Sequence, residues 1–480
     1  MTNISPEKKR NLMFLLFALL PEAILEGVLI PQYPYIVKFL LPNELEENIG
    51  HYVGILGSAF YLPLFVMNLF WGAASDKIGP KPILIAGLIV CLITTIGFGL
   101  AQNFWILVFL RFLSGIFGAN STVAKGMIGE TFRNQDARAW SYSLYGSVYG
   151  VSGIIGPLIG GILSNPASLY PDYIGKDSLL GRFPYLLTSM VGSLLALCSL
   201  YTTIFYLRTK GNKEPLYDAI DDMDSPGALQ LTPISRQPDS SDAHDGNQSD
   251  DSQLGVVRRS PTRKRNPFTL DDDVTLVEPA KVAYSFTSWK TVGPIMLYCI
   301  LAYTNMAYFT SLPLFLSASA PLGLNLNSRD TSFFVTTISM AKLLVQLVFV
   351  EKLIVYLRGP IPTYRLGMFL YMPAHLLVPM LSGTPIDLVL PPLLFFMTIF
   401  GGCESLGYVS IMLIVTDSAG PSNLGMAHGF ASTMAAFVRT IAPSITGYLW
   451  EVGVHHGWPG FMFAFGAVTS ALGGICAQFV

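Results

Sequence analysis

Long apolar stretches separated by short polar segments run through most of the chain. Each stretch has about 20 residues or more and few charges, enough to cross the roughly 30 Å hydrocarbon core of a bilayer as a helix. Backbone groups find no water there, and the alternation of a barrel strand does not occur, so helices are expected. The predicted spans are 12–39, 51–74, 82–101, 104–127, 141–163, 184–207, 291–318, 331–355, 364–382, 388–415, 424–450 and 459–479.

The pattern predicts twelve spans in two groups of six. The boundaries around Pro360 and Pro385 are the weakest, which leaves eleven or thirteen spans as alternatives. Between the groups, residues 209–290 are rich in Asp, Ser, Pro and Gln and poor in aromatic residues, a composition too polar to bury a core. We therefore expect an all-α polytopic membrane protein with an N-terminal six-helix bundle (1–208), a disordered linker (209–290) and a C-terminal six-helix bundle (291–480).

Lys and Arg outside the spans are concentrated on one side of the expected membrane. They cluster before residue 12, after the second and fourth spans, in the linker and after the eighth span. The opposite loops hold only Lys38, Lys176, Arg182 and Arg329. Because basic residues are retained in cytosolic loops, this bias predicts that both termini and the linker face the cytosol.

Composition agrees with a membrane protein and argues against other classes. Of the 480 residues, 51% are hydrophobic and 12% are charged, against about a quarter charged in soluble domains. A net charge of -2 gives no reason to expect a nucleic-acid partner. The five cysteines all lie in apolar stretches, and the sequence contains no nucleotide-binding loop, paired-Cys motif or His-rich loop. We expect neither an enzyme nor a cofactor nor a bound metal.

The segment after span 51–74 carries a pattern of glycines and charges. Gly72 is followed by Asp76, Gly79 and Lys81. A glycine allows close helix packing or a tight turn, and an aspartate can bond to a helix N-terminus or to a basic side chain. An ordinary basic turn is the alternative. We expect a cytosolic gate in which Asp76 bonds to the loop after span 104–127.

These residues resemble the loop signature of the major facilitator superfamily, G-x-x-x-D-x-x-G-R-K, with Pro80 in place of the first basic residue. Span 141–163 contains Gly156-Pro157-Leu-Ile-Gly160-Gly161, similar to the element that marks proton-driven antiporters in that family. Thr416 to Ala419 and Arg439 to Gly447 resemble the same branch, the twelve-span drug:proton antiporters and the plant and fungal zinc-induced-facilitator-like proteins. The resemblance implies two bundles around a central cavity, in a monomer of the plasma membrane or the vacuolar membrane.

Two Pro and Gly pairs occupy corresponding spans of the two groups. Gly156-Pro157 and Pro443 lie six spans apart, as in repeated halves. Such pairs indicate bends with close backbone packing at the interface between the halves, and the alternative is that membrane helices are simply rich in Gly and Pro. Gly156, Pro157, Gly160 and Pro443 are therefore gating candidates.

Charged residues inside spans are functional candidates, because a charge in mid-bilayer costs several kcal/mol unless it has a partner or faces a cavity. In the family's fold, the spans that hold them line the cavity or form the walls between the halves. We take six of these residues as a proton-coupling network: Glu22, Glu26, Arg111, Lys342, Glu404 and Arg439. Lys125 lies near the cytosolic end of its span.

Glu26 and Arg111 are expected to meet. At 1.5 Å per residue, both lie about 20 Å from the cytosolic edge of the membrane core. Glu22 is one turn away on the same face. A carboxylate with a mobile arginine partner can change its affinity for a proton when substrate binds, whereas a permanent bridge would only orient two helices.

Glu404 and Arg439 are expected to repeat this arrangement, as a cation-binding carboxylate or a fixed bridge. Lys342 is expected either to bind an anionic group or to cap carbonyls at a bend. Aromatic and amide side chains that face the cavity are substrate-binding candidates, although tyrosines at helical spacing more often serve packing. These candidates are Gln32, Tyr35, Asn120, Tyr303, Asn305, Tyr308 and Tyr408.

Together these features predict a secondary active transporter that exports a small organic solute from the cytosol in exchange for protons. Its expected partners are the lipid bilayer, a small-molecule substrate and protons. The alternatives are a proton-independent facilitator and a transporter-shaped sensor or scaffold that moves nothing.

Overall fold

The computed structural model describes residues 4–132, 135–175, 177–209, 289–382, 386–419 and 424–480. Apart from its two end residues and position 289, the predicted linker lies outside these ranges. Arg133 also lies outside them, and the side chains of Asp76 and Arg138 belong to the part that is not described. The expected bond between Asp76 and the loop after the fourth span therefore stays a prediction.

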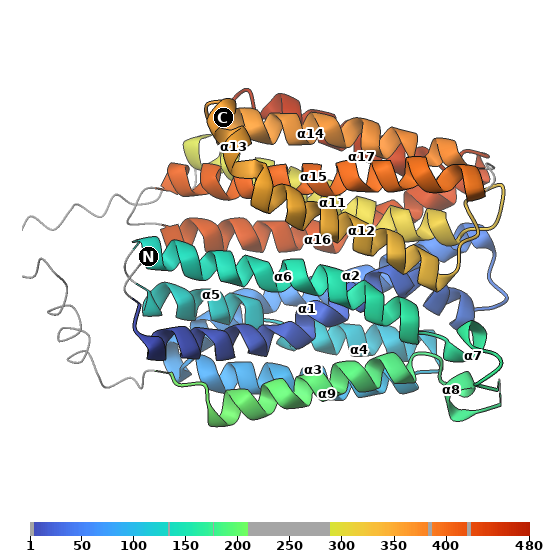
Figure 1. Cartoon of the computed structure of the whole chain (residues 1–480), viewed down its shortest axis with the longest axis horizontal. Coiled ribbons are helices and arrows are strands. Elements are labelled where there is room, and N and C mark those ends of the chain that lie inside the picture. Colours follow the sequence, from blue (N-terminus) through green and yellow to red (C-terminus); the bar gives the residue numbers. More distant parts are fainter. Residues whose placement is uncertain (1–3, 133–134, 176, 210–288, 383–385, 420–423) are drawn as a thin grey trace, which may run out of the picture. The chain divides into compact units, whose positions relative to one another are not determined.

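The N-terminal half contains helices α1 to α9, and the C-terminal half contains α11 to α17 (Figure 1). The first set is α1 (Pro6–Leu40), α2 (Glu46–Ile78), α3 (Pro80–Leu100), α4 (Phe104–Phe117), α5 (Asn120–Thr131), α6 (Gln135–Leu163), α7 (Pro166–Leu169), α8 (Leu179–Arg182) and α9 (Leu186–Phe205). The second set is α11 (Trp289–Ser317), α12 (Ser328–Val348), α13 (Val350–Tyr356), α14 (Pro360–Leu377), η1 (Pro379–Leu381), α15 (Ile386–Ala419), α16 (Leu424–His455) and α17 (Phe461–Cys476). The described ranges contain no strand.

Within the described ranges, nine helical segments are long and apolar enough to cross a membrane. Three further helices, α14, α16 and α17, occupy the remaining predicted spans. With α4 and α5 counted as one span and α12 and α13 as another, the fold has the twelve expected spans. The prediction of an all-helical membrane protein is confirmed.

Local sequence signals explain where several helices begin. The side chain of Asn103 accepts hydrogen bonds from the first amides of α4, and that of Asn327 accepts one from Asp330 N in α12. Gly79 joins α2 to α3 with a φ of 90°. A residue with a Cβ atom rarely adopts that conformation, so the tight turn expected at Gly79 is confirmed.

The two halves pack against each other along two pairs of helices. α2 lies along α16, and α6 lies along α12. On α2, a Cβ atom at Gly50, Gly54 or Gly57 would collide with α16, at Gly447 O, Pro443 O and Pro443 Cβ respectively. The backbones therefore touch almost directly along this line.

The fourth span differs from the prediction of one continuous helix. The chain breaks at Gly118 and Ala119, between α4 and α5. Glycine weakens a helix, and a Cβ atom at Gly115 would collide with the carbonyl of Phe60 on α2. The close approach of α2 requires these glycines, and the helix of the fourth span is interrupted next to them.

Candidate functional site

Arg111 on α4 and Glu26 on α1 form the expected ion pair inside the N-terminal half. Arg111 Nη1 lies 2.8 Å from Glu26 Oε1, and the side chains are 5% and 18% exposed. The guanidinium also lies 4.6 Å from the centroid of the Phe60 ring. In the described part of the chain, Glu26 Oε2 and two nitrogens of Arg111 have no hydrogen-bond partner. The pair therefore has bonding capacity that it does not use.

The break between α4 and α5 places Asn120 against α1. Asn120 Nδ2 donates to Glu22 Oε2 at 3.2 Å, one turn of α1 from Glu26. A Cβ atom at Gly87 of α3 would collide with the Asn120 side chain, so this glycine makes room for the amide. Asn120 Oδ1 is buried without a partner among the described residues. The break thus places a polar side chain beside the two carboxylates.

A pocket in the N-terminal half contains these polar groups. Its lining includes Glu22, Glu26, Arg111 and Asn120, and α1, α2, α3, α4 and α9 supply the rest of its wall. Most of the other lining side chains are apolar, including Leu25 and several aromatic residues. A low-dielectric wall strengthens every electrostatic interaction inside the pocket. Any change in the charge of one carboxylate will therefore act on its neighbours.

The second half contains a different ion pair from the one expected. Glu404 on α15 pairs with Lys342 on α12, with Lys342 Nζ 2.6 Å from Glu404 Oε1. The side chains are 28% exposed for Lys342 and 5% exposed for Glu404. A Cβ atom at Gly401 would collide with the backbone of α12, so the two helices touch and bring these side chains together. The expected pair of Glu404 with Arg439 was wrong, and Lys342 neither caps carbonyls nor stands free.

Arg439 on α16 contacts tyrosine instead of a carboxylate. Its Nη2 donates to Tyr408 Oη at 3.2 Å. The Tyr408 ring in turn lies 5.4 Å from Lys342 Nζ, and its hydroxyl lies 3.5 Å from Asn305 Oδ1. Tyr408 therefore links three of the predicted candidates.

Two other tyrosine candidates have different surroundings. Tyr308 is fully buried, and its ring stacks on Phe400 at a centroid distance of 3.5 Å. It belongs to the core of the C-terminal half, so its predicted place on the cavity wall was wrong in this conformation. Tyr303 is half-buried, and its hydroxyl has no partner in the described part of the chain.

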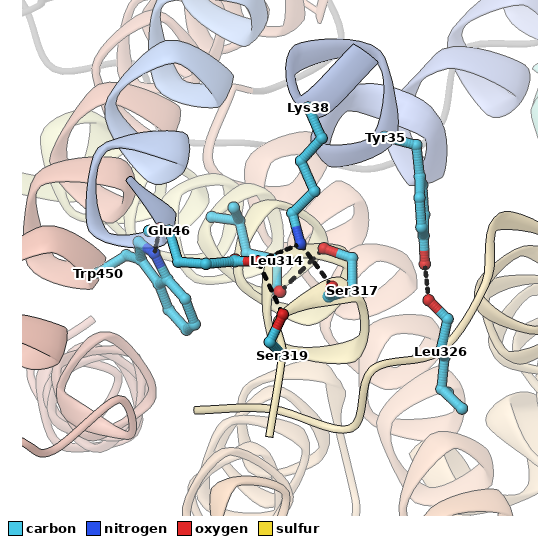
Figure 2. A network of polar contacts seen from close by, with 8 residues as sticks. All are labelled: Tyr35, Lys38, Glu46, Leu314, Ser317, Ser319, Leu326 and Trp450. Carbon is cyan, nitrogen blue, oxygen red and sulfur yellow. Dashed lines mark hydrogen bonds and ion pairs between the residues drawn. The ribbon is translucent and has the colours of Figure 1, made fainter. Parts of the chain in front are cut away.

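Gln32 and Tyr35 near the end of α1 bond across the two halves. Gln32 Nε2 donates to Ser332 Oγ at 2.9 Å, and Ser328 Oγ donates to Gln32 Oε1 at 2.6 Å. Tyr35 Oη donates to Leu326 O at 2.8 Å (Figure 2). Gln32 also borders the pocket, but its bonds hold α12. These bonds differ from the substrate contacts that we expected of both side chains.

Lys38 and Glu46 continue this closure where α1 ends and α2 begins. Lys38 Nζ lies 3.0 Å from Glu46 Oε1 and donates to Ser317 O at the end of α11 at 2.7 Å. Ser319 Oγ donates to the same carboxylate, and Trp450 Nε1 of α16 donates to Glu46 O (Figure 2). The sequence does not mark these residues as functional, because a charge at a span end is ordinary. Their only signal was the position of Lys38 in the last turn of α1.

The gating candidates fall into separate places. Among the described residues, no atom lies within 4 Å of the position that a Cβ atom of Gly72 would take, so these residues do not show the close helix approach expected there. Lys81 Nζ donates to Ile204 O of α9. Pro443 packs against α2 of the other half, as expected.

The Gly-Pro pair of α6 contacts α1 of its own half, whereas we expected it at the interface between the halves. A Cβ atom at Gly156 would lie 2.7 Å from Ile24 O of α1, and Pro157 packs against Gly27 of the same helix. Gly160 also faces α1. These contacts lie within the N-terminal half, whereas Gly153 and Gly161 face α12 of the other half.

Membrane-spanning helices with paired charges in their interior define a polytopic membrane transporter. The Major Facilitator Superfamily model matches residues 15–320. The chain belongs to that superfamily, and it is a transporter of the bilayer with a small-molecule substrate and not an enzyme.

Two curated relatives cover most of the chain. Protein ZINC INDUCED FACILITATOR 1 of Arabidopsis thaliana is 27% identical, over 92% of this chain and 84% of the relative. The Major facilitator superfamily multidrug transporter mfsB of Aspergillus fumigatus is 26% identical, over 94% of this chain and 79% of the relative. These matches confirm the resemblance to the plant and fungal members.

Two solved structures share the fold. The human organic anion transporter MFSD10 (TETRAN) has a TM-score of 0.59 at 14% identity, over 99% of this chain and all of that one. A bacterial homologue of the human lysosomal transporter Spinster, in an inward-facing and unoccupied conformation, has a TM-score of 0.60 at 13% identity, over 99% and 96%. At this identity the likeness concerns the fold alone.

Proposed function

We propose that this transporter exports a small organic solute from the cytosol in exchange for protons, as a monomer of the plasma membrane or the vacuolar membrane. The supporting observation is the buried pair of Glu26 and Arg111, with one carboxylate oxygen unpartnered beside a pocket. Two bundles, residues 1–208 and 291–480, move relative to each other. The linker and both termini lie in the cytosol.

Proton exchange takes place at Glu26. A proton on the carboxylate removes its charge and weakens the hold on Arg111. The guanidinium keeps its contact with the Phe60 ring but loses the attraction of the Glu26 charge. Arg111 can then move away from α1, and the electrostatics of the pocket change with it.

Alternating access follows from the uneven bonding between the halves. The described hydrogen bonds across the halves lie between mid-span Ser58 and the turn from α1 to α2. None is described between the halves at the opposite end, where α1 and α11 begin. The conformation is closed at the end where α1 meets α2. Transport requires the bonds of Lys38 and Tyr35 to the other half to break and re-form.

The test uses purified protein in proteoliposomes with an acidic interior. Ethidium, tetracycline and naphthoate serve as probes, with and without a protonophore. At least one should accumulate, and the protonophore should abolish the accumulation. Equal uptake with and without the gradient would instead identify a facilitator.

Glu26→Gln identifies the coupling residue. The variant keeps the volume of the side chain, and Phe60 still contacts Arg111, so it should fold and bind the probe but no longer accumulate it. Glu7→Gln, which removes an exposed acid at the start of α1, is the matched control. Accumulation by Glu26→Gln at the normal level would contradict the assignment.

A further inference from the structure

Two cations in the interior of the transporter have no acidic partner among the residues that the structure describes. Lys125 lies on α5 and Arg439 on α16, and both side chains are half-buried. In the ranges that the structure describes, the ion pairs involve Lys38, Arg111, Arg208 and Lys342, but neither Lys125 nor Arg439. A charged side chain inside a span is energetically costly unless it has a partner or faces a cavity. The position of these two cations therefore suggests a function.

The two cations belong to different halves and act on each other. The helices α5 and α16 contact each other across the two halves, and the ammonium of Lys125 and the guanidinium of Arg439 lie near enough on them to repel one another. Lys342 adds to the repulsion at Arg439, and its own partner Glu404 is already engaged. His428 on α16 is also close to Lys125. Positive charge therefore exceeds negative charge around Lys125 and Arg439, between α5 and α16.

Tyrosines surround both cations. Lys125 Nζ lies 5.5 Å from the centroid of the Tyr145 ring of α6, and the Tyr145 hydroxyl lies 2.6 Å from Ser121 Oγ. On the other side, Arg439 donates to Tyr408, whose ring meets that of Tyr298 edge to face at 6.3 Å. Aromatic rings lower the cost of a nearby cation but leave its charge uncancelled.

We propose that Lys125 and Arg439 together bind the carboxylate of a small organic anion, with the tyrosine rings around the apolar body of that anion. A guanidinium offers a planar pair of donors that matches a carboxylate, and an ammonium offers a point charge. This inference rests on the proposed transport function and names its substrate class. The pocket of Glu22 and Glu26 has neither Lys125 nor Arg439 in its lining.

The arrangement also connects substrate binding to movement. Without an anion, two like charges from opposite halves push the halves apart at this place. A bound carboxylate removes the repulsion and attracts both side chains. The substrate therefore favours approach of α5 and α16, which the empty transporter resists.

The experiment measures ligand binding to the full-length protein in detergent, without any gradient. Naphthoate is compared with naphthamide, which has the same ring and no charge, and with naphthylmethylamine, which is a cation. Naphthoate should raise the unfolding temperature and bind, and the other two should bind at least about tenfold more weakly. Equal binding of the acid and the amide would overturn the proposal.

Three variants locate the site. Arg439→Gln and Lys125→Gln should each weaken naphthoate binding about tenfold or more. Arg439→Lys keeps the positive charge, so its affinity for naphthoate should fall by a smaller factor. Lys352→Gln removes an exposed positive charge on α13 and should bind normally. Since Lys125 and Arg439 hold no ion pair, their loss should leave folding intact, which a single symmetric size-exclusion peak checks. Undiminished binding by Arg439→Gln would reject the assignment.

The two proposals fail in different ways. A protein that accumulates ethidium under a proton gradient but binds no naphthoate would retain the proposed transport and lose the anion site. A protein that binds naphthoate through Lys125 and Arg439 but accumulates no probe would retain the anion site and lose proton-coupled export.

Discussion

The ion pairs of the two halves are built with opposite accessibility. In the N-terminal half the base is the more deeply buried partner, with Arg111 at 5% and Glu26 at 18% exposure. In the C-terminal half the acid is the more deeply buried, with Glu404 at 5% and Lys342 at 28%. The accessible member of a pair is the one that can exchange a proton or meet a ligand. The comparison therefore favours a protonatable carboxylate in the first half and a cation that attracts anions in the second.

The largest effect should come from leaving the buried acid of the second half without its base. Lys342→Gln leaves Glu404 unpaired, and removal of one partner of a buried ion pair costs about 3–5 kcal/mol. Thermal unfolding in detergent measures the loss. Lys342→Arg should stay near the native stability, and the double variant with Glu404→Gln should regain most of what the single one loses. Equal stability of the single and double variants would show that Glu404 does not need Lys342.

Separating α1 from α6 should have the next largest effect. Gly156→Ala places a methyl group against Ile24 O and Gly27, and overpacking of this kind costs about 1–3 kcal/mol. The displacement of α1 also moves Glu26, so transport should fall more than folding. Gly146→Ala on the same helix meets no atom within 4 Å and is the control. Equal stability and equal transport of the two variants would show that the close contact of α1 with α6 is not required.

Removal of one hydroxyl distinguishes the two cations of the second half. Tyr408→Phe deletes the acceptor of Arg439 but keeps the ring that faces Lys342. The expected loss of stability is about 0.5–1.5 kcal/mol, the contribution of one hydrogen bond. Thermal unfolding of Tyr408→Phe is compared with that of Tyr408→Leu, which removes the ring as well. We expect Tyr408→Leu to lose more stability than Tyr408→Phe. Equal unfolding temperatures would show that the ring does not contribute to stability.

The smallest effect on stability is expected at the closure between the halves. Lys38→Gln removes a partly exposed ion pair, which contributes about 0.2–1 kcal/mol. Opening at this end should become more frequent, because Ser317 O also loses its donor. The labelling rate of a cysteine introduced at position 319 measures this opening. Glu7→Gln breaks an exposed pair far from the closure and should leave the rate unchanged.

Residue counting along regular helices predicted the first pair but not the second. Glu26 and Arg111 lie at one depth and are brought together by helices that the sequence delimits well. In the second half we expected Arg439 to be the partner of Glu404, and the structure gives Lys342 instead. The choice of Lys342 depends on the rotation of α12 against α15, which the contact at Gly401 sets. A sequence pattern contains no information about such a rotation.

The break in the fourth span and the roles of Gln32 and Tyr35 needed the structure for other reasons. The span is apolar enough to predict one helix, and only the contact of Gly115 with α2 reveals the break. Gln32 and Tyr35 face the other half, as expected of polar side chains on α1, but they meet protein because this conformation is closed at their end. Sequence indicates which face of a helix is polar, and the conformational state decides what that face touches.

The line of glycines on α2 has a consequence for how fast the transporter can switch. Where Gly50, Gly54 and Gly57 lie against α16, hardly any side chain reaches across from α2. Interlocked side chains would have to leave one rotamer and enter another during each turn of the helices, and here there are few to do so. Rotation of α2 on α16 therefore meets little friction. The time for one cycle is then set by the making and breaking of the polar bonds between the halves, from Ser58 to the turn after α1.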